Sequence, residues 1–499
     1  MNERIGATVP GETATVDTVI VDTVIVGSGF AGLGLAVKLD AAGRRDWVIL
    51  EKGATLGGTW RDNEYPGCAC DVESHLYSFS FRQNPDWTRT FARQPEIRAY
   101  LEGVADHYGL RDRIRYGAHV TGAEWDGKGW DVRLADGTTI RARFVVFGTG
   151  ALHDPSIPEI EGLDRFIGTA FHSAQWDHAH DLHGKRVAVI GTGASAIQFV
   201  PAIAPDVESL TLFQRTAPWV LPKGDKPISD DARRRYRRFP ALQRLARTAI
   251  YWRHEALVAG FLNPKLMKVI GRVASTYLDR SFAKNPELKA KLTPDFTIGC
   301  KRILLSNDYY PALRRDNVHV ETTGIARVTE TGVVTTDGVE HPCDTIVFGT
   351  GFKIADSLSR MTITGRDGAK LGDAWRGGME ALLGTTVAGF PNLFLLTGPN
   401  TGLGHSSMVL MIESQIPYVL DAMSTVDKHR ATAIDTVRER QDDFNVAVQA
   451  KLDKAVWSQG GCGSWYLDEH GRNRTLWPGA TFTYRRRTRR IDPADHVLL

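Results

Sequence analysis

A glycine-rich turn near the N-terminus constrains the fold of this chain more than any other feature. Residues 18–26 are mostly β-branched and apolar, as a buried parallel strand requires, and Gly27, Gly29 and Gly32 follow at once, ahead of a helical pattern over 33–39. In such a turn the first glycine permits the tight bend, the second lets the backbone approach a pyrophosphate, and the third lets helix and strand pack closely. The pattern predicts a dinucleotide-binding βα unit.

An acidic residue stands where this unit needs one. The strand predicted over 47–50 ends in Glu51, about 20 residues beyond the turn, and a carboxylate at that point accepts hydrogen bonds from ribose hydroxyls. A glycine-rich loop without a ligand is the alternative. The strand before the turn, the helix after it and the acid at the right distance favour a nucleotide site.

The same pattern returns in the middle of the chain. A strand predicted over 186–190 leads into Gly191, Gly193 and Ser195, and Ala196 takes the place of the third glycine, which the fingerprint tolerates. Two such sites in one chain imply that a nicotinamide reduces a flavin, so FAD and a nicotinamide dinucleotide are the predicted cofactors.

The second site differs from the first at the end of its second strand. The strand predicted over 210–213 is followed by Arg215 and Thr216, with no carboxylate. An acid there would repel a 2′-phosphate, whereas a guanidinium forms charge-assisted hydrogen bonds to it. NADPH is therefore predicted over NADH, with a solvated surface arginine as the alternative role for Arg215.

The chain of 499 residues is longer than a single core supports, so several domains are expected. The predicted class is α/β, with two Rossmann-like dinucleotide-binding domains, for FAD and NADPH, and a helical insertion. The predicted ranges are an FAD domain begun over 17–158, an NADPH domain begun over 159–228, the insertion over 229–295, the rest of the NADPH domain over 296–345, and completion of the FAD domain with a C-terminal segment over 346–499.

The predicted helical insertion is basic at its start and more apolar over 245–262. Its apolar stretch is compatible with lining a substrate pocket or with lying on a membrane surface. The plainer alternative is a set of helices packed on the NADPH domain with a solvated basic face.

Composition limits partners and location. The formal charge of +3 is too small to indicate a nucleic acid partner, and no stretch reaches the roughly 18 uncharged apolar residues of a spanning helix. Residues 1–17 are predicted to be a polar tail without the apolar run of a signal peptide. Five cysteines, of which only Cys68 and Cys70 are close, form neither a disulfide framework nor a metal-binding pattern, which favours a reducing cytoplasm.

Between the two turns, Phe166, Gly168, His172, Trp176 and Asp177 have the spacing F-x-G-x-x-x-H-x-x-x-W-D. This segment resembles the fingerprint of type I Baeyer–Villiger monooxygenases, which are class B flavoproteins. Related flavin-containing N- and S-monooxygenases share the start of the pattern but usually lack its last two residues.

A second signature of that family is also matched. Gly58, Thr59 and Trp60 follow Gly57, then come Tyr65-Pro-Gly67 and Asp71. The resemblance implies that these residues help to bind the cofactors. It also implies an FAD-dependent NADPH monooxygenase that uses O₂ to convert a small-molecule ketone to an ester or lactone through a C4a-peroxyflavin. A flavin-containing N- or S-monooxygenase is the alternative.

The resemblance also assigns candidate catalytic residues, Arg302, Asp71 and His172. Arg302 is expected over the flavin, because a guanidinium that stays charged stabilises an anionic peroxide and the oxyanion formed on a ketone. Asp71 is expected to orient Arg302, with a helix cap near Ser74 as the alternative. His172 is expected with Trp176 in the link between domains, where it couples cofactor binding to domain movement; a core histidine is the alternative.

Two further cofactor contacts follow from the resemblance. Lys301 is expected to bind the NADP phosphate, and Trp465 to fold over the nicotinamide, with an ordinary core tryptophan as the alternative. The chain departs from the family at Cys68-Ala69-Cys70, where many members have an arginine, so the surroundings of Asp71 are expected to differ. A redox-active cysteine pair is disfavoured, because disulfide-reducing flavoproteins usually place a cysteine where this chain has Trp60.

Overall fold

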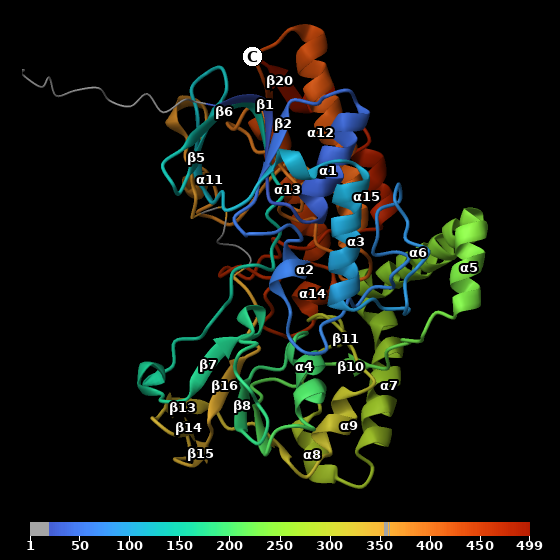
Figure 1. Ribbon diagram of the computed structural model, residues 1–499, viewed down its shortest axis with the longest axis vertical. Helices are drawn as coiled ribbons and strands as arrows, with labels where there is room; N and C mark the ends of the chain where they lie inside the picture. The colour runs from blue at the N-terminus through green and yellow to red at the C-terminus, as the bar shows by residue number, and fades with distance from the viewer. Residues whose placement is uncertain (1–18, 354–357, 359) are drawn as a thin grey trace, which may run out of the picture.

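Two sheets of largely parallel strands organise the chain, one above the other along the long axis of the molecule (Figure 1). The computed structural model describes residues 19–353, 358 and 360–499. The predicted polar tail and Thr18, the first residue of the first predicted strand, lie outside the described residues. The two sheets and the helices around them confirm the predicted α/β class.

The first sheet is built around β1 (Val19–Val26), which lies parallel to its two neighbours, β2 (Trp47–Leu50) and β6 (Thr139–Phe147). β18 (Leu393–Leu395) also pairs with β6, so a strand from late in the chain completes a sheet begun at its start. The remaining strands of this sheet are β3 (Ile114–Arg115), β4 (Val120–Trp125), β5 (Trp130–Leu134) and β17 (Thr362–Thr364).

Helices cover the central strands β1, β2 and β6 of the first sheet, whose last residues are apolar and buried. α1 (Phe30–Ala41) begins three residues before the predicted helix and packs against α3 (Gln94–His107) and α12 (Met408–His429). Ile25 of β1 and most buried apolar side chains of these helices belong to one hydrophobic cluster, whereas Val24 and Val26 belong to a second cluster. Helix α12 follows β18, so both elements that close this unit come from the C-terminal part of the chain.

The second sheet is wholly parallel, in the order β12-β9-β8-β16-β7. Its strands are β7 (Thr169–His172), β8 (Arg186–Ile190), β9 (Ser209–Phe213), β12 (Val318–Glu321) and β16 (Thr345–Phe348), and α4 (Ala196–Ile203) follows β8. The predicted boundary between residues 345 and 346 is wrong, because all of β16 pairs within this sheet. A small antiparallel sheet of β13 (Ile325–Val328), β14 (Gly332–Thr335) and β15 (Glu340–Pro342) lies beside it.

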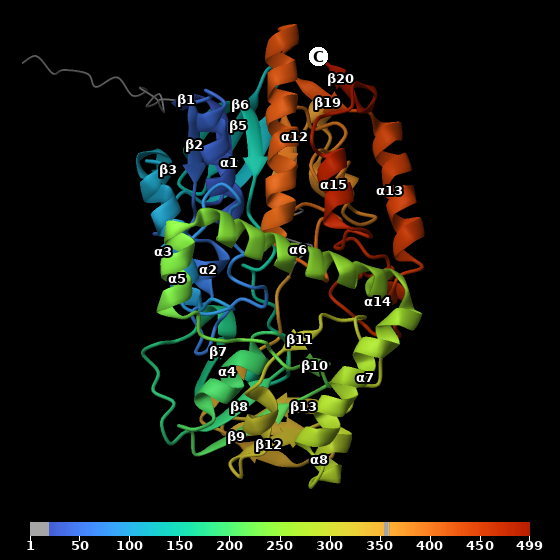
Figure 2. The ribbon, with the colours of Figure 1, turned by 90° about the vertical axis from the view of Figure 1, so that its right-hand side faces the viewer.

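The predicted insertion folds as four helices, α5 (Asp230–Arg238), α6 (Pro240–Leu262), α7 (Pro264–Ser281) and α8 (Pro286–Lys291). Three of the four begin with a proline, whose missing N–H costs nothing at a helix start. Figure 2 shows α6 running across one side of the molecule and α7 continuing from its end toward the second sheet. Short strands β10 (Val220–Leu221) and β11 (Leu304–Leu305) pair on either side of this insertion.

The C-terminal part of the chain belongs again to the unit built around the first sheet. Its elements are β19 (Ile434–Thr436), α13 (Arg438–Leu452), α14 (Val456–Gln459), α15 (Thr481–Arg487) and β20 (His496–Leu498). Shorter helices α2 (Thr59–Asp62), α9 (Tyr309–Leu313) and α11 (Leu371–Ala374) lie elsewhere in the chain. Within the described residues, no helix combines the length and apolar character needed to cross a bilayer.

Candidate active site

Both glycine turns line a single cavity with a volume of about 1280 Å³. Its walls also include Asp71, Arg302 and the turn over residues 397–403 that joins β18 to α12. No residue of the helical insertion over 229–295 is among its lining residues, so the role of pocket wall considered for that insertion does not apply to this cavity. Two dinucleotide turns that open into one cavity allow two cofactors to meet there.

The first glycine turn is fixed by close backbone packing. Gly27 has φ +100°, and a β-carbon at this position would lie 2.8 Å from the carbonyl oxygen of Gly148. A β-carbon on Gly32 would lie only 1.9 Å from the carbonyl oxygen of Gly27. Both positions therefore exclude a side chain, as the first and third glycines of a dinucleotide turn do.

Glu51 lies at the end of β2 and is only 3% exposed. Its carboxylate accepts hydrogen bonds from the Ser28 hydroxyl at 2.6 Å and the Ser28 amide at 3.0 Å, and from Nη1 of Arg61 at 2.5 Å. Burial alone would raise the pKa of Glu51, but these hydrogen bonds and the Arg61 charge lower it below its usual value. Glu51 is therefore ionised on the cavity wall.

The residue that pairs with Glu51 comes directly after the Gly58-Thr59-Trp60 signature. Gly58, Thr59 and Trp60 line the cavity and open α2, whose next residue is Arg61. The indole N–H of Trp60 donates to the hydroxyl of Tyr77 at 3.1 Å. Sequence reasoning missed Arg61, although its position directly after the signature was a usable signal.

The second glycine turn has the same geometry at its start. Gly191 has φ +103°, and a β-carbon there would lie 2.6 Å from the carbonyl oxygen of Gly349. Gly193 and Ser195 line the cavity, and Ser195 is the N-cap residue of α4. Ala196 is fully buried in the place of the third glycine, which shows that this turn has room for a methyl group.

Two cations meet beyond the second turn. Arg215 and Lys301 both line the cavity, and burial together with the nearby Arg215 charge lowers the pKa of Lys301. The Nζ atom of Lys301 lies 5.0 Å from the centre of the Phe296 ring. Within the described residues neither Arg215 nor Lys301 has an ion-pair partner. The neighbouring Thr216 accepts a hydrogen bond from the Thr192 hydroxyl through its carbonyl oxygen. Two neighbouring cations without an ion pair favour an anionic ligand, and the one acid that acts on Lys301, Asp295, is not close enough to pair with it.

Arg302 and Asp71 form an ion pair on the cavity wall. Nε and Nη2 of Arg302 lie 2.7 and 2.6 Å from Oδ2 of Asp71, and Nη1 donates to the carbonyl oxygen of Leu403 at 3.1 Å. Burial would raise the pKa of Asp71, but the charge and hydrogen bonds of Arg302 lower it, and the Asp71 charge raises the pKa of Arg302. No helix begins between residues 71 and 78, so the helix-cap alternative for Asp71 is wrong.

His172 lies outside the cavity wall, at the end of β7. It is 1% exposed, its Nδ1 accepts from the amide of Ala174 at 3.1 Å, and its ring meets that of Phe352 edge-on at 5.6 Å. β7 pairs with β16, and Phe352 follows β16 where the chain leaves the second sheet. His172 therefore has no contact with the cavity. It lies beside the segment that connects the unit of the second sheet to the unit of the first sheet.

Trp176 joins the same region through aromatic contacts. Its ring lies 5.1 Å from that of Phe171 on β7 and 5.5 Å from that of Phe199 on α4. The last part of the fingerprint thus packs on the helix that follows the second glycine turn.

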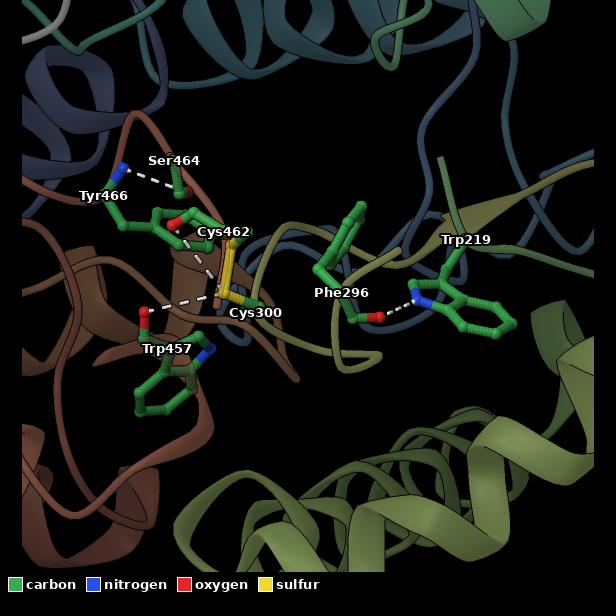
Figure 3. Close-up of a disulfide and its surroundings, with 7 residues drawn as sticks. All are labelled: Trp219, Phe296, Cys300, Trp457, Cys462, Ser464 and Tyr466. Atoms are coloured by element: carbon green, nitrogen blue, oxygen red, sulfur yellow. Dashed lines mark hydrogen bonds between the residues drawn. A yellow bond between two sulfur atoms is a disulfide. The ribbon is translucent and has the colours of Figure 1, made fainter. Parts of the chain in front are cut away.

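A disulfide joins the Arg302 segment to the C-terminal segment (Figure 3). Cys300 and Cys462 are bonded, with their Cα atoms 6.2 Å apart, although 162 residues separate them in sequence. The expectation that the cysteines form no disulfide framework therefore needs correction at this pair, because spacing along the chain does not reveal a long-range contact. Neither cysteine lines the cavity.

The segment after Cys462 carries Trp465 and Tyr466. Trp465 lines the cavity and is 49% exposed, so the alternative of a core tryptophan is wrong. Tyr466 is buried beside it, and burial raises its pKa to about 12, opposed by the positive charge of Arg302. The disulfide thus holds the loop of Arg302 and the segment of Trp465 together.

Cys68 and Cys70 are free thiols and both are buried. Burial raises the pKa of Cys68 to about 12 and raises that of Cys70 as well. Because the thiolate is the reactive form, these environments oppose redox chemistry at either residue.

Sequence reasoning also missed two residues that hold the segment before Asp71. Gln198 of α4 accepts from the amide of Ala69 at 3.1 Å and donates to its carbonyl oxygen at 3.0 Å. Nζ of Lys223 donates to the carbonyl oxygen of Cys70 at 3.1 Å. Both contacts link the Asp71 segment to the unit of the second sheet, and no motif marks either residue.

Comparisons with known proteins place this geometry in context. A family model described as pyridine nucleotide-disulphide oxidoreductase matches residues 24–239. A Baeyer-Villiger monooxygenase of Pseudomonas aeruginosa is 52% identical over 470 residues, which cover 93% of this chain and 89% of the relative. A solved oxidized steroid monooxygenase bound to NADP has a TM-score of 0.86 at 33% identity, covering 96% of this chain and 100% of that one. A solved OTEMO complex with FAD and NADP has a TM-score of 0.84 at 28% identity, covering 94% of this chain and 97% of that one.

Proposed function

The chain belongs to the type I Baeyer–Villiger monooxygenases, and on that premise we propose that it uses NADPH and O₂ to convert a small-molecule ketone to an ester or lactone. The observation that carries this proposal is the Arg302–Asp71 ion pair on the wall of a cavity that both glycine turns share. A cytoplasmic location is part of the same proposal, but the cysteines no longer support it, because Cys300 and Cys462 are bonded and disulfides are rare in a reducing cytoplasm.

The cofactors are FAD and NADPH, and the residues on the cavity wall fit them. The close-packed turn at Gly27 and Gly32 and the buried carboxylate of Glu51 match the pyrophosphate and ribose of FAD. The turn at Gly191 and the unpaired cations Arg215 and Lys301 match the phosphates of NADPH. Bound FAD would supply the redox chemistry, taking up a hydride from NADPH and, once reduced, reacting with O₂.

Arg302 contributes a fixed positive charge at the reacting centre. Its guanidinium stays protonated, and its contacts with Asp71 and with the Leu403 carbonyl hold its position before the substrate arrives. Such a preorganised cation stabilises the negative charge that develops on the carbonyl oxygen of the ketone when that carbon is attacked. Asp71 then acts as a positioning residue, through Arg302.

His172 is a positioning residue in this proposal. It has no contact with the cavity and lies where the chain passes from the second sheet back to the first. Its side chain is therefore placed to couple the orientation of the two units to the occupancy of the NADPH site. Trp465, half exposed on the cavity wall, is placed to cover the nicotinamide.

Product analysis tests the proposal directly. The enzyme is incubated with NADPH and O₂ and with a panel of cyclic, linear and steroidal ketones, and with an organic sulfide in parallel. Ester or lactone from a ketone supports the proposal. Sulfoxide without any ester or lactone would instead identify a flavin-containing S-monooxygenase, and NADPH oxidation that no ketone or sulfide accelerates would contradict both.

A further inference from the structure

Helices α6 and α7 present an exposed apolar surface, which we name the α6–α7 face. Its large side chains are Leu242, Leu245 and Trp252 on α6 and Leu266, Val269 and Val273 on α7. Leu245 is 66% exposed, Trp252 56% and Val269 60%. The two helices run one after the other along the same side of the molecule (Figure 2). Exposed apolar side chains gathered in this way mark an interaction surface.

The polar inner side of α6 determines this orientation. Nη1 of Arg247 donates to the carbonyl oxygens of His75, Leu76 and Ser78 at 2.7 to 3.0 Å. Glu255 accepts from the amide and the hydroxyl of Thr481 at 2.9 and 2.6 Å. Turning α6 to bury its leucines would remove the partners of these charged groups at a large cost in free energy. The apolar side of α6 is therefore directed outward by the fold.

The charged residues around this face are mostly basic. Residues 232–278 contain eleven arginines and lysines and a single acidic residue, Glu255, which is buried. On α7 each of the three apolar residues directly follows a cation, so a basic stripe runs beside the apolar one. Among residues 232–278, all of which the structure describes, six cations have no ion-pair partner: Arg235, Arg238, Arg244, Lys265, Lys268 and Arg272.

We propose that the α6–α7 face binds the surface of an anionic phospholipid bilayer. Leucine, valine and tryptophan side chains enter the boundary between headgroups and acyl chains, while flanking lysines and arginines are attracted to anionic headgroups. A second copy of the chain fits this face poorly. In a symmetric dimer the six unpaired cations would lie close to the same six cations of the partner copy. The exposed acids of α5 and α7, Asp230, Asp231 and Asp279, are already paired with Arg233, Arg234 and Lys289.

Vesicle flotation tests this proposal with the FAD-loaded enzyme. The enzyme is expected to float with vesicles of phosphatidylcholine and phosphatidylglycerol in equal parts, to remain unbound with phosphatidylcholine alone, and to be released by high salt. Replacing the three α7 cations by serine, as K265S, K268S and R272S, is expected to weaken binding about tenfold or more. The apolar variant W252S with V269S is expected to lose binding as well.

A matched control separates this face from general surface hydrophobicity. Val339 and Val446 are exposed apolar residues outside the insertion, and V339S with V446S is expected to bind vesicles as the parent does. None of the substituted residues lines the cavity, so every variant should keep the flavin spectrum and the rate of NADPH oxidation. That readout also separates failure of this proposal from failure of the proposed function.

Two results would overturn the inference. One is equal binding, or no binding, to anionic and to zwitterionic vesicles. The other is a dimer in analytical ultracentrifugation that W252S with V269S converts to a monomer, which would assign the face to a second copy of the chain.

Discussion

The guanidinium of Arg302 holds the carboxylate of Asp71 through two nitrogens, at 2.7 and 2.6 Å, across 231 residues of sequence. The two residues come from different parts of the chain, and the pair lies where the two cofactor units face each other. Disulfide Cys300–Cys462 holds the arginine loop from its other side. The charge of Arg302 on the cavity wall is thus positioned by contacts among three separate segments.

The first prediction concerns the two halves of the reaction. Arg302→Ala should still reduce its flavin with NADPH under anaerobic conditions, because only the oxygenation step needs the cation. Ester or lactone formation should fall about 10²–10³-fold, as it does when one preorganised charge donor is removed. Stopped-flow absorbance and product analysis measure the two halves separately. Unchanged product formation would exclude the proposed role of Arg302.

The second prediction concerns the choice of nicotinamide. Arg215→Ala should reduce kcat/KM for NADPH about tenfold or more while leaving that for NADH nearly unchanged, because a charge-assisted hydrogen bond to the 2′-phosphate is lost. Steady-state kinetics with both nucleotides give the ratio. Arg165→Ala is the matched control, since Arg165 is exposed and lies outside the cavity wall. An equal loss with both nucleotides would remove Arg215 from the phosphate site.

The third prediction concerns the disulfide. Cys462→Ser should lower the free energy of unfolding by about 2–4 kcal/mol, because the bond closes a long loop in the unfolded chain. Thermal unfolding at a fixed scan rate measures the change, and a reducing agent should shift Tm in the parent but not in the variant. Cys343→Ser is the control, because Cys343 is a free buried cysteine. Alkylation of all five cysteines in unreduced, unfolded protein would show that the bond does not form.

The fourth prediction concerns stability at acid pH. Burial, aided by the Arg247 charge, lowers the pKa of His75 to about 4 from its usual 6.5. Between these values the unfolded chain binds a proton that the folded chain does not, so the free energy of unfolding falls as the pH drops from 6.5 toward 4. The full effect of such a shift is about 3 kcal/mol.

A substitution isolates this contribution. His75→Gln should flatten the loss of stability between pH 6.5 and 4, measured by denaturant unfolding at several pH values, whereas His183→Gln, at an exposed position, should leave it unchanged. An identical pH profile for His75→Gln and the parent would show that His75 does not titrate in this way.

Local rules allowed the sequence by itself to determine several features of this protein. Glycines at 27, 32 and 191 are required by backbone conformation or by contacts as close as 1.9 Å, and strand ends place Glu51 and Arg215 beside these turns. Such constraints act over a few residues, so they can be read from spacing alone. The fingerprint around His172 then identified the family, and with it the expected partnership of Asp71 and Arg302.

Only the tertiary structure decided what depends on contacts between distant segments. It assigned all of β16 to the second sheet, joined Cys300 to Cys462, and placed Gln198 against the segment of Asp71. It also turned the polar side of α6 inward, which its sequence pattern alone did not indicate. These outcomes depend on which surfaces meet when the units pack, and packing energies between distant residues leave no periodic signal along the chain.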